Sequence, residues 1–299
     1  MIAKALLQAR QLELSLRPSY PREIATAILR YGAMVGAECE HLPEASRCMD
    51  LARAEIQICD REDRSFPSGR VILADQLTGG KGRFLRHWHA PAGGVWMVLT
   101  LANTLLPEHA ALYPLAAGVA CCETVRHFGL NATVKWVNDV LLGGRKVAGI
   151  LTETVSSSRG GEEFVLIGIG LNVNNTSFAP ELRNTAASMC EFSGHPFDLT
   201  EIAAMLIAKL SWNIGLLHYT EAEHLAADRG LDDDRPHPLI ASWRLLTDTI
   251  GRRVRFGFNV VESAQYTATV VDVDPCGHLV MRLENGDLVT ESGGEIMYL

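Results

Sequence analysis

Two lysines and an aspartate stand in a segment that otherwise has the pattern of a β-hairpin. The segment is KWVNDVLLGGRKVAGIL, residues 135–151, and it contains Lys135, Asp139 and Lys146. Lysines grouped around a carboxylate are suited to hold an anion such as a phosphate. A solvated hairpin face is the alternative interpretation, because exposed ion pairs contribute only about 0–1 kcal/mol.

The turn of this hairpin predicts which side chains share a face. Gly143 and Gly144 separate two apolar runs, which is typical of a two-residue loop that fixes the pairing register. The predicted register pairs Leu142 with Arg145, Leu141 with Lys146 and Asp139 with Ala148. Because side chains alternate along a strand, one face is expected to carry Lys135, Asp139, Lys146, Ala148 and Ile150. Asn138 and Gly149 are expected on the other face.

A glycine-rich loop supplies a second group of cations. The loop is LTGGKGRFLRHW, residues 77–88, and it holds Lys81, Arg83 and Arg86. Glycines let the backbone approach a ligand, so this composition suits a phosphate or carboxylate, while a mobile loop with solvated bases is the alternative. It is not a P-loop, because Gly82 follows Lys81 where that motif needs Ser or Thr.

Composition limits the class of protein. The chain has 299 residues, 47% hydrophobic and 21% charged, with a net charge of −8, which argues against a general nucleic-acid binder. Seven cysteines without a CxxC pair or zinc-ligand spacing predict reduced thiols. The N-terminus lacks the apolar run of a signal peptide, and no stretch approaches 18 uninterrupted apolar residues. These features predict a cytoplasmic protein without a membrane partner.

Periodicity predicts an α/β or α+β fold, with a sheet covered by helices on at least one side, followed by a small β-domain. The expected helices are 2–16, 21–31, 44–58, 108–128, 199–218 and 238–248, and the expected strands outside the hairpin are 70–75, 94–102 and 163–173. From Gly251 onward, short alternating strands predict a β-barrel of about 45 residues.

The order of three motifs resembles the biotin protein ligases over roughly residues 40–299. The family loop GRGRxGRxW, aligned on Trp88, matches Gly80, Lys81, Gly82, Arg83 and Arg86. The hairpin KWPND with a following Lys and AGIL matches Lys135, Trp136, Asn138, Asp139, Lys146, Ala148, Gly149, Ile150 and Leu151. The strand motif GxGxN matches Gly168, Gly170 and Asn172, and SGGEI at 292–296 resembles the end of an SH3-like domain.

The resemblance implies an architecture and a reaction. It implies a helical extension at 1–38, a class II synthetase-like biotin/lipoate ligase catalytic domain at 39–248 and an SH3-like domain at 249–299. Biotin attacks the α-phosphorus of ATP, and a lysine of a biotin carboxyl carrier domain then attacks the biotinyl-adenylate. Lys146, Arg83 and Asp139 are implied as catalytic, with Mg²⁺ held through the ATP phosphates. The implied binding residues are Ser46, Arg47, Leu77, Gly80, Lys81, Gly82, Arg86, Trp88, Lys135, Asn138, Gly149, Gly170 and Asn172.

The chain departs from the family pattern around the acid-binding side. Leu77 stands where the family has Gln, and Lys81 stands where it has the first loop Arg. Leu85 replaces a glycine, which is expected to restrict positive φ. Val137 replaces the Pro of KWPND, and Ala45, Ser46 and Arg47 replace Ser-Thr-Asn.

These departures leave alternatives open. A related ligase or acyltransferase for lipoate or octanoate is one, and a non-catalytic ligand-binding paralogue is another. Repressor members of the family carry a winged helix-turn-helix of about 60 residues, whereas 38 residues precede the matching region here, so no nucleic-acid binding is expected. Edge strands of the central sheet can pair with those of a second copy of the chain, so a homodimer is also left open.

Overall fold

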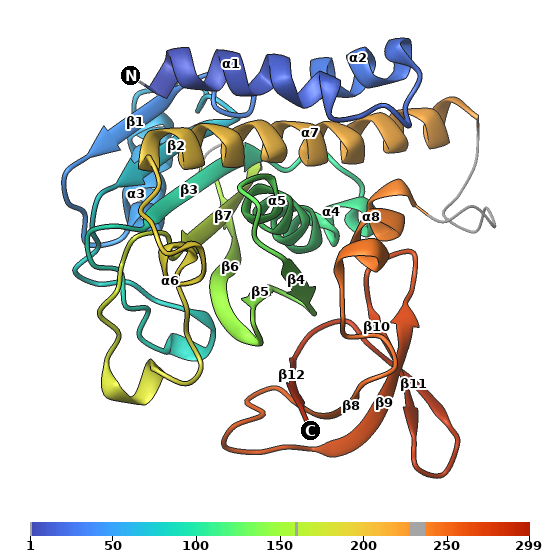
Figure 1. Ribbon diagram of the computed structural model, residues 1–299. Helices are drawn as coiled ribbons and strands as arrows, with labels where there is room; N and C mark the ends of the chain where they lie inside the picture. Colours follow the sequence, from blue (N-terminus) through green and yellow to red (C-terminus); the bar gives the residue numbers. More distant parts are fainter. Residues whose placement is uncertain (1, 159–160, 228–236) are drawn as a thin grey trace.

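The core of the protein is a seven-stranded mixed sheet. The computed structural model describes residues 2–158, 161–227 and 237–299 (Figure 1). The strands are β1 (Cys39–Leu42), β2 (Arg70–Ala74), β3 (Val95–Ala102), β4 (Ala132–Lys135), β5 (Asp139–Leu142), β6 (Arg145–Ser156) and β7 (Glu163–Leu171), in the order β1-β2-β3-β7-β6-β5-β4. β1 and β2 are parallel, and the other neighbours are antiparallel.

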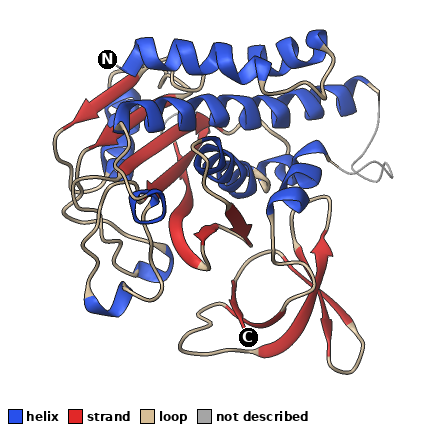
Figure 2. Ribbon diagram, viewed as in Figure 1, coloured by secondary structure: helices blue, strands red, loops and turns tan. Residues whose placement is uncertain are grey.

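Helices cover both faces of this sheet, as the strand sequences require. In β2, Val71 and Leu73 belong to one apolar core, while Ile72 and Ala74 belong to another on the opposite face. The second core is closed by α3 (Cys48–Arg61). The first core is closed by α5 (Tyr113–His127), α7 (Leu199–Ala226) and α8 (Pro238–Leu246). The short helices α4 (Pro107–Ala110) and α6 (Met189–Ser193), and 3-10 turns at Arg83–Leu85 and Pro180–Leu182, complete the helical elements (Figure 2).

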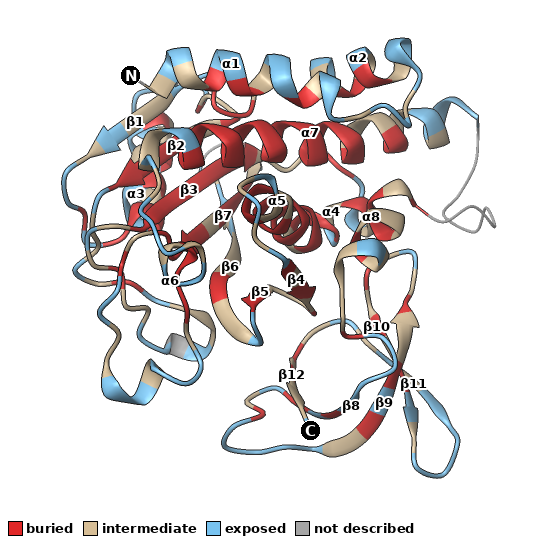
Figure 3. Ribbon diagram, viewed as in Figure 1, coloured by how far each residue is buried: buried red, intermediate tan, exposed pale blue. Residues whose placement is uncertain are grey.

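The long helix α7 is the centre of the helical layer. Its length and hydropathy would suit a membrane span, yet the most apolar window is 83% buried within the protein. Figure 3 shows it buried along most of its length. The apolar character of α7 is therefore explained by core packing.

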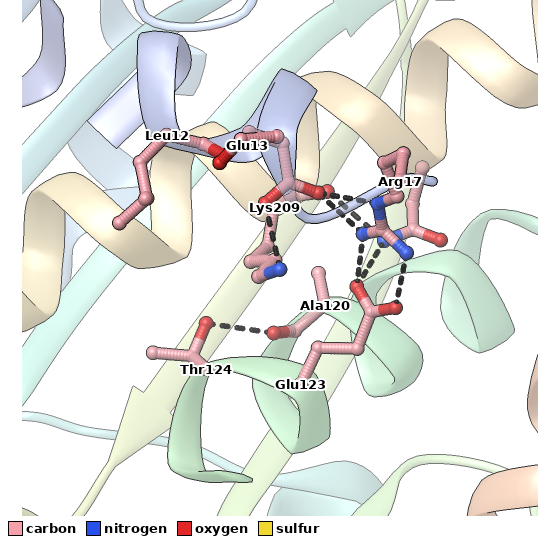
Figure 4. Close-up of polar contacts among 9 residues, drawn as sticks. Leu12, Glu13, Arg17, Ala120, Glu123, Thr124 and Lys209 are labelled. Carbon is pink, nitrogen blue, oxygen red and sulfur yellow. Dashed lines mark hydrogen bonds and ion pairs between the residues drawn. The ribbon is translucent and has the colours of Figure 1, made fainter. Parts of the chain in front are cut away.

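The N-terminal helices α1 (Ile2–Ser15) and α2 (Arg22–Tyr31) lie along α7 (Figure 1). A Cβ at Gly215 would stand 2.2 Å from the backbone oxygen of Ile28, so glycine there permits α2 and α7 to touch. Figure 4 shows the ion pairs that join these helices to the core. Arg17 donates two hydrogen bonds of 2.7 Å to Glu123, and Lys209 lies 2.6 Å from the buried Glu13. The N-terminal segment is thus packed into the molecule.

A second sheet of five antiparallel strands follows α8. It agrees with the small SH3-like domain that the sequence predicts. Its strands are β8 (Arg253–Gly257), β9 (Tyr266–Val273), β10 (Leu279–Leu283), β11 (Leu288–Glu291) and β12 (Glu295–Tyr298), in the order β11-β10-β9-β8-β12. The boundaries at residues 38 and 248 stay predictions.

Some predicted element bounds were wrong. The helix expected at 44–58 begins at Cys48, because residues 45–47 are extended and Ala45 N–H donates to Gln76 O at 3.1 Å. The helix expected at 108–128 is split into α4 and α5. Pro114 stands in the first turn of α5, where the backbone N–H groups have no partner within the helix. Its missing N–H therefore costs nothing there, and a proline at this position favours the start of a new helix. β1 was not predicted.

Candidate active site

A cavity of about 530 Å³ is lined by residues of the main sheet, the start of α3, the glycine-rich loop and the C-terminal sheet. Its wall is built from residues distant in sequence. It is lined by residues 47–49, most of 80–89, parts of 135–151, 168–172 and 178–186, and by 295–298 of the C-terminal sheet. Of the residues implied by the motifs, only Ser46 is not part of the lining; it is exposed, and its backbone oxygen accepts from Gly79 N–H at 2.9 Å. The geometry therefore assigns Ser46 a place outside the cavity wall.

The three charged residues of the hairpin meet in this cavity. Asp139 Oδ1 lies 2.5 Å from Lys146 Nζ, and Asp139 Oδ2 lies 3.7 Å from Lys135 Nζ. Burial alone would raise the pKa of Asp139, but Lys146, Lys135 and Arg83 outweigh it and lower this pKa. The carboxylate of Asp139 is therefore stabilised in its ionised form and holds the two ammonium groups in place.

The predicted hairpin register is correct only near the turn. Leu142 pairs with Arg145 and Leu141 pairs with Lys146, as expected. A bulge then shifts the strands, so that Asp139 pairs with Gly149 and not with Ala148. Because the bulge adds one residue to β6, the face that carries Lys146 also carries Gly149.

The prediction that Ala148 and Ile150 share the Lys146 face was consequently wrong. Both residues are buried in the apolar core on the other side of the sheet. A Cβ built on Gly149 would stand 3.0 Å from Lys146 Nζ, which shows that this glycine lies directly under the ammonium group. The bulge could not be read from alternation, because alternation assumes an unbroken ladder.

Trp88 covers the two glycine positions of the cavity floor. A Cβ at Gly170 would stand 2.4 Å from its indole nitrogen, and one at Gly149 would stand 3.0 Å from its ring. Lys146 Nζ lies 5.2 Å from the ring centroid, within cation–π range. Glycines at these positions therefore leave room for the indole beside the charged group.

The glycine-rich loop is tied to the C-terminal sheet. Arg83 donates to Gly294 O at 2.7 Å, and Arg86 makes a bidentate pair with Glu295 at 2.9 and 2.8 Å. Burial lowers the pKa of Arg83, with Glu295 and Asp139 opposing that effect. Positive φ in the loop occurs at Phe84 (56°), the residue before Leu85.

The remaining predicted residues have structural partners as well as cavity surface. Asn138 donates to Ile150 O at 2.8 Å, and Asn172 Oδ1 accepts from Asn175 at 3.0 Å. Gly80 is needed beside Trp88, because a Cβ there would stand 2.4 Å from Trp88 O. Lys81 is exposed and forms a backbone bridge with His87 across the loop. Gly82 also lines the cavity, together with Gly80, Lys81, Asn138 and Asn172.

Sequence reasoning missed the contribution of the C-terminal sheet. Trp136 Nε1 donates to Gly277 O at 3.0 Å, and Lys135 Nζ lies 5.6 Å from the ring of Tyr298. It also missed the segment around Thr185, whose carbonyl accepts from Lys146 N–H at 2.7 Å. The SGGEI motif at 292–296 was the signal for the C-terminal sheet. The motif alone does not show which residues the carboxylate of Glu295 contacts.

The fold and site together define a class of α+β protein with a cavity that contains a cluster of cationic side chains, next to an SH3-like domain. A family model described as the biotin/lipoate A/B protein ligase family matches residues 55–174. A biotin--[acetyl-CoA-carboxylase] ligase of Mycobacterium tuberculosis is 30% identical over 243 residues, covering 77% of this chain and 79% of the relative. The chain belongs to this family of biotin protein ligases.

Other relatives match part of their length. The bifunctional ligase/repressor BirA of Bacillus spizizenii is 31% identical over 182 residues, and the match spans 55% of that protein. Among solved structures, a biotin protein ligase from Aquifex aeolicus in complex with biotin and ATP shares the fold, with a TM-score of 0.67 and 19% identity. That likeness covers 88% of this chain and 99% of the neighbour.

Proposed function

We propose that this protein is an ATP-dependent ligase that activates biotin as biotinyl-AMP and transfers it to a lysine of a biotin carboxyl carrier domain. The observation that carries the proposal is the cluster of Lys146, Lys135 and Arg83 around the half-buried Asp139 in the cavity wall. Relatives named as biotin ligases support the choice of substrate. Cytoplasmic location and the absence of a nucleic-acid partner belong to the same proposal.

The cation cluster suits the first step. When the acid's carboxylate oxygen attacks the α-phosphorus of ATP, two anions approach each other and pyrophosphate leaves. Fixed ammonium and guanidinium groups stabilise the charge that spreads over the phosphoryl oxygens. Lys146 is positioned for this role by Asp139 and by its backbone bond to Thr185. Trp88 and the loop exclude water from the acyl-phosphate that forms.

The second step breaks the acyl–phosphate bond. The neutral amine of the acceptor lysine attacks the acyl carbon, AMP leaves as the acyl–phosphate bond breaks, and the nitrogen gives up one proton to the departing phosphate or to solvent as the amide forms. The attacking amine must be neutral, and the carboxylate of Asp139 is the nearest cavity anion to Lys146 that could orient it. Its two lysine partners make Asp139 better suited to orienting ammonium groups than to removing a proton.

A protein-held metal is not supported by the side chains. The described ranges contain no group of three His, Cys, Asp or Glu residues that could hold a metal ion. The cavity carboxylates Asp139 and Glu295 both have cationic partners. Mg²⁺ is therefore proposed to enter bound to the ATP phosphates, and no step is assigned to it.

One observation favours another acid. Leu77 lines the cavity where a polar side chain was expected, and an apolar wall suits the tail of lipoate or octanoate. The alternative of a non-catalytic paralogue is disfavoured, because Lys146 and Arg83 both face the cavity.

Acid-dependent exchange of pyrophosphate into ATP tests the proposal. Lys146→Ala is expected to lower the exchange rate by about 10²–10³-fold, because a fixed charge at the phosphoryl group is lost. Arg145→Ala is the matched control, since Arg145 pairs with Glu191 at 2.6 Å and does not line the cavity. Exchange within about threefold of the unmodified protein would remove Lys146 from the chemistry.

A further inference from the structure

Lys135 is the less firmly held of the two lysines in the cation cluster. Its Nζ lies 3.7 Å from Asp139 Oδ2, whereas Lys146 Nζ lies 2.5 Å from Oδ1 of the same carboxylate. A separation of 3.7 Å is an ion pair without a hydrogen bond. Because a lysine side chain is long and flexible, Lys135 needs another contact to keep its ammonium group at one place in the cavity.

That second contact comes from the last strand of the C-terminal sheet. Lys135 Nζ lies 5.6 Å from the ring centroid of Tyr298 in β12, within the range of a cation–π contact. Both residues line the cavity. An aromatic ring attracts an ammonium group without neutralising its charge, so the charge of Lys135 stays available to an anionic ligand.

The ring of Tyr298 is itself fixed by other groups. Its hydroxyl donates to Asp248 Oδ1 at 3.0 Å and lies 2.7 Å from Thr249 Oγ1. Arg252 Cζ lies 4.4 Å from the ring centroid. Burial raises the pKa of Tyr298, so the phenol keeps its proton and remains a hydrogen-bond donor at neutral pH. The ring is therefore a fixed surface against which the ammonium group rests.

The backbone that carries Lys135 is held by the same part of the chain. β4 is an edge strand of the main sheet, and Thr247 Oγ1 donates to Val134 O at 2.7 Å. On the other side of Lys135, Trp136 Nε1 donates to Gly277 O at 3.0 Å. Contacts from the C-terminal part of the chain thus fix this backbone, and the long side chain is what remains to be placed.

We propose that Tyr298 is a positioning residue that holds the ammonium group of Lys135 in place for the phosphate groups of a nucleotide. The face of the phenol ring makes the contact, and the hydroxyl serves to orient the ring. This inference rests on the proposed function, because Lys135 belongs to the cation cluster that is proposed to act on ATP.

Calorimetric titration with ATP and Mg²⁺, without any acid, tests this role in the full chain. Tyr298→Leu and Tyr298→Met both remove the ring, with side chains of different shape, so a loss of folding in one leaves the other. The Kd for ATP is expected to rise by about 5- to 30-fold, because the side chain of Lys135 is only 19% exposed and its cation–π contact is largely desolvated.

Two variants serve as controls for the ring. Tyr298→Phe keeps the ring and loses only the hydroxyl, so its Kd for ATP should stay within about twofold of that of the unmodified protein. Arg252→Met removes the other cation on the same ring, and Arg252 is not one of the lining residues, so the same result is expected. An equal rise of Kd in these variants and in Tyr298→Leu would overturn the inference.

A double-mutant cycle with Lys135→Met separates positioning from a structural role. If the ring acts through the ammonium group, Tyr298→Leu should have little further effect on the Kd once Lys135 is replaced. Additive effects would reject the role of Tyr298 and leave the proposed function intact. The expected coupling without acid-dependent pyrophosphate exchange would reject the proposed function alone. No binding of ATP by the unmodified protein would reject both.

Discussion

Asp139 holds two lysines that would otherwise repel each other inside the cavity. Its carboxylate contacts Lys146 and Lys135, and its pKa is lowered despite burial. A carboxylate with a lowered pKa stabilises the folded state above its unfolded pKa, and this contribution is lost as pH falls through the folded pKa. The cluster therefore needs an ionised Asp139 at neutral pH.

Asp139→Asn is expected to reduce both activity and stability. The amide keeps the shape of the side chain but leaves two ammonium groups without their anion, which should lower the free energy of unfolding by about 1–3 kcal/mol. Urea unfolding at pH 7 and pyrophosphate exchange would measure the two effects. Unchanged values of both would show that the lysines are positioned by other groups.

At this scale the sequence predicted the cluster but not its detailed geometry. The types and spacing of Lys135, Asp139 and Lys146 were sufficient to bring them together. The bulge that puts Gly149 on the Lys146 face depends on the packing of Val147 and Ala148 into one core, which no local pattern records.

Among the elements, the glycine-rich loop is held by the C-terminal sheet through Arg86 and Glu295. Glu295→Gln removes the charge from a bidentate pair, so the loop should be cleaved faster by protease and the KM for ATP should rise. Ligand is expected to slow cleavage, since the loop covers the cavity.

Glu284→Gln is the matched control for this loop prediction, because Glu284 pairs with Arg253 on an exposed part of the same sheet. Equal cleavage rates in Glu295→Gln and Glu284→Gln would show that the pair does not restrain the loop.

A second group of elements meets at buried histidines. His109 of α4 and His237, which precedes α8, are 2% and 3% exposed, and the His109 ring centroid lies 5.5 Å from that of His224 and 5.7 Å from that of His237. Burial and the neighbouring rings lower the pKa of His237 from 6.5 to about 3. Burial also lowers the pKa of His109, and the nearby carboxylates of Glu221 and Glu108 oppose this shift without reversing it. Glu221 accepts from Leu106 N–H at 2.6 Å.

The free energy of unfolding should therefore fall as pH drops from about 6.5 toward 3. In this pH window the histidines of the unfolded chain bind protons, whereas the buried histidines of the folded chain stay neutral. Each such histidine lowers the free energy of unfolding by up to about 1.4 kcal/mol per pH unit. His237→Asn, which retains a cap for α8, should flatten the slope. His195→Gln, at an exposed site, should not. A stability that is flat below pH 6.5 in the unmodified protein would contradict this account.

Periodicity predicted most of the elements, because most of them bury one or both faces against a core. It failed where the chain is fixed by long-range contacts. β1 was missed since its residues CEHL carry no alternation, and they are extended because they pair with β2. The split between α4 and α5 was missed although Pro114 marks it.

Across the whole molecule, the N-terminal helices are joined to the core by buried ion pairs. Arg17 bonds both Glu123 and Glu13, and Glu13 also pairs with Lys209 (Figure 4). Arg17→Met should lower the free energy of unfolding by about 3–5 kcal/mol, because it leaves buried carboxylates with fewer partners. Chemical denaturation measures this loss.

Arg64→Met is the control for this prediction, because Arg64 pairs with Glu62 on the exposed surface and its loss should leave the free energy of unfolding nearly unchanged. Equal stability of the Arg17 and Arg64 variants would mean that the N-terminal helices do not stabilise the catalytic domain. The sequence could not predict this network, since Glu123 lies 106 positions from its partner Arg17, and Lys209 is further still from Glu13.

The bond from Arg83 to Gly294 joins residues 211 positions apart. β12 follows every other element in the chain, so it is also the last of them to leave a ribosome during synthesis. Until then the loop lacks its anchor, and the wall formed by residues 295–298 does not exist. A nascent chain would therefore fold its main sheet early and gain a closed cavity only at the end. If the protein has the proposed function, the order of translation delays the formation of an acyl-adenylate until the C-terminal sheet has been made.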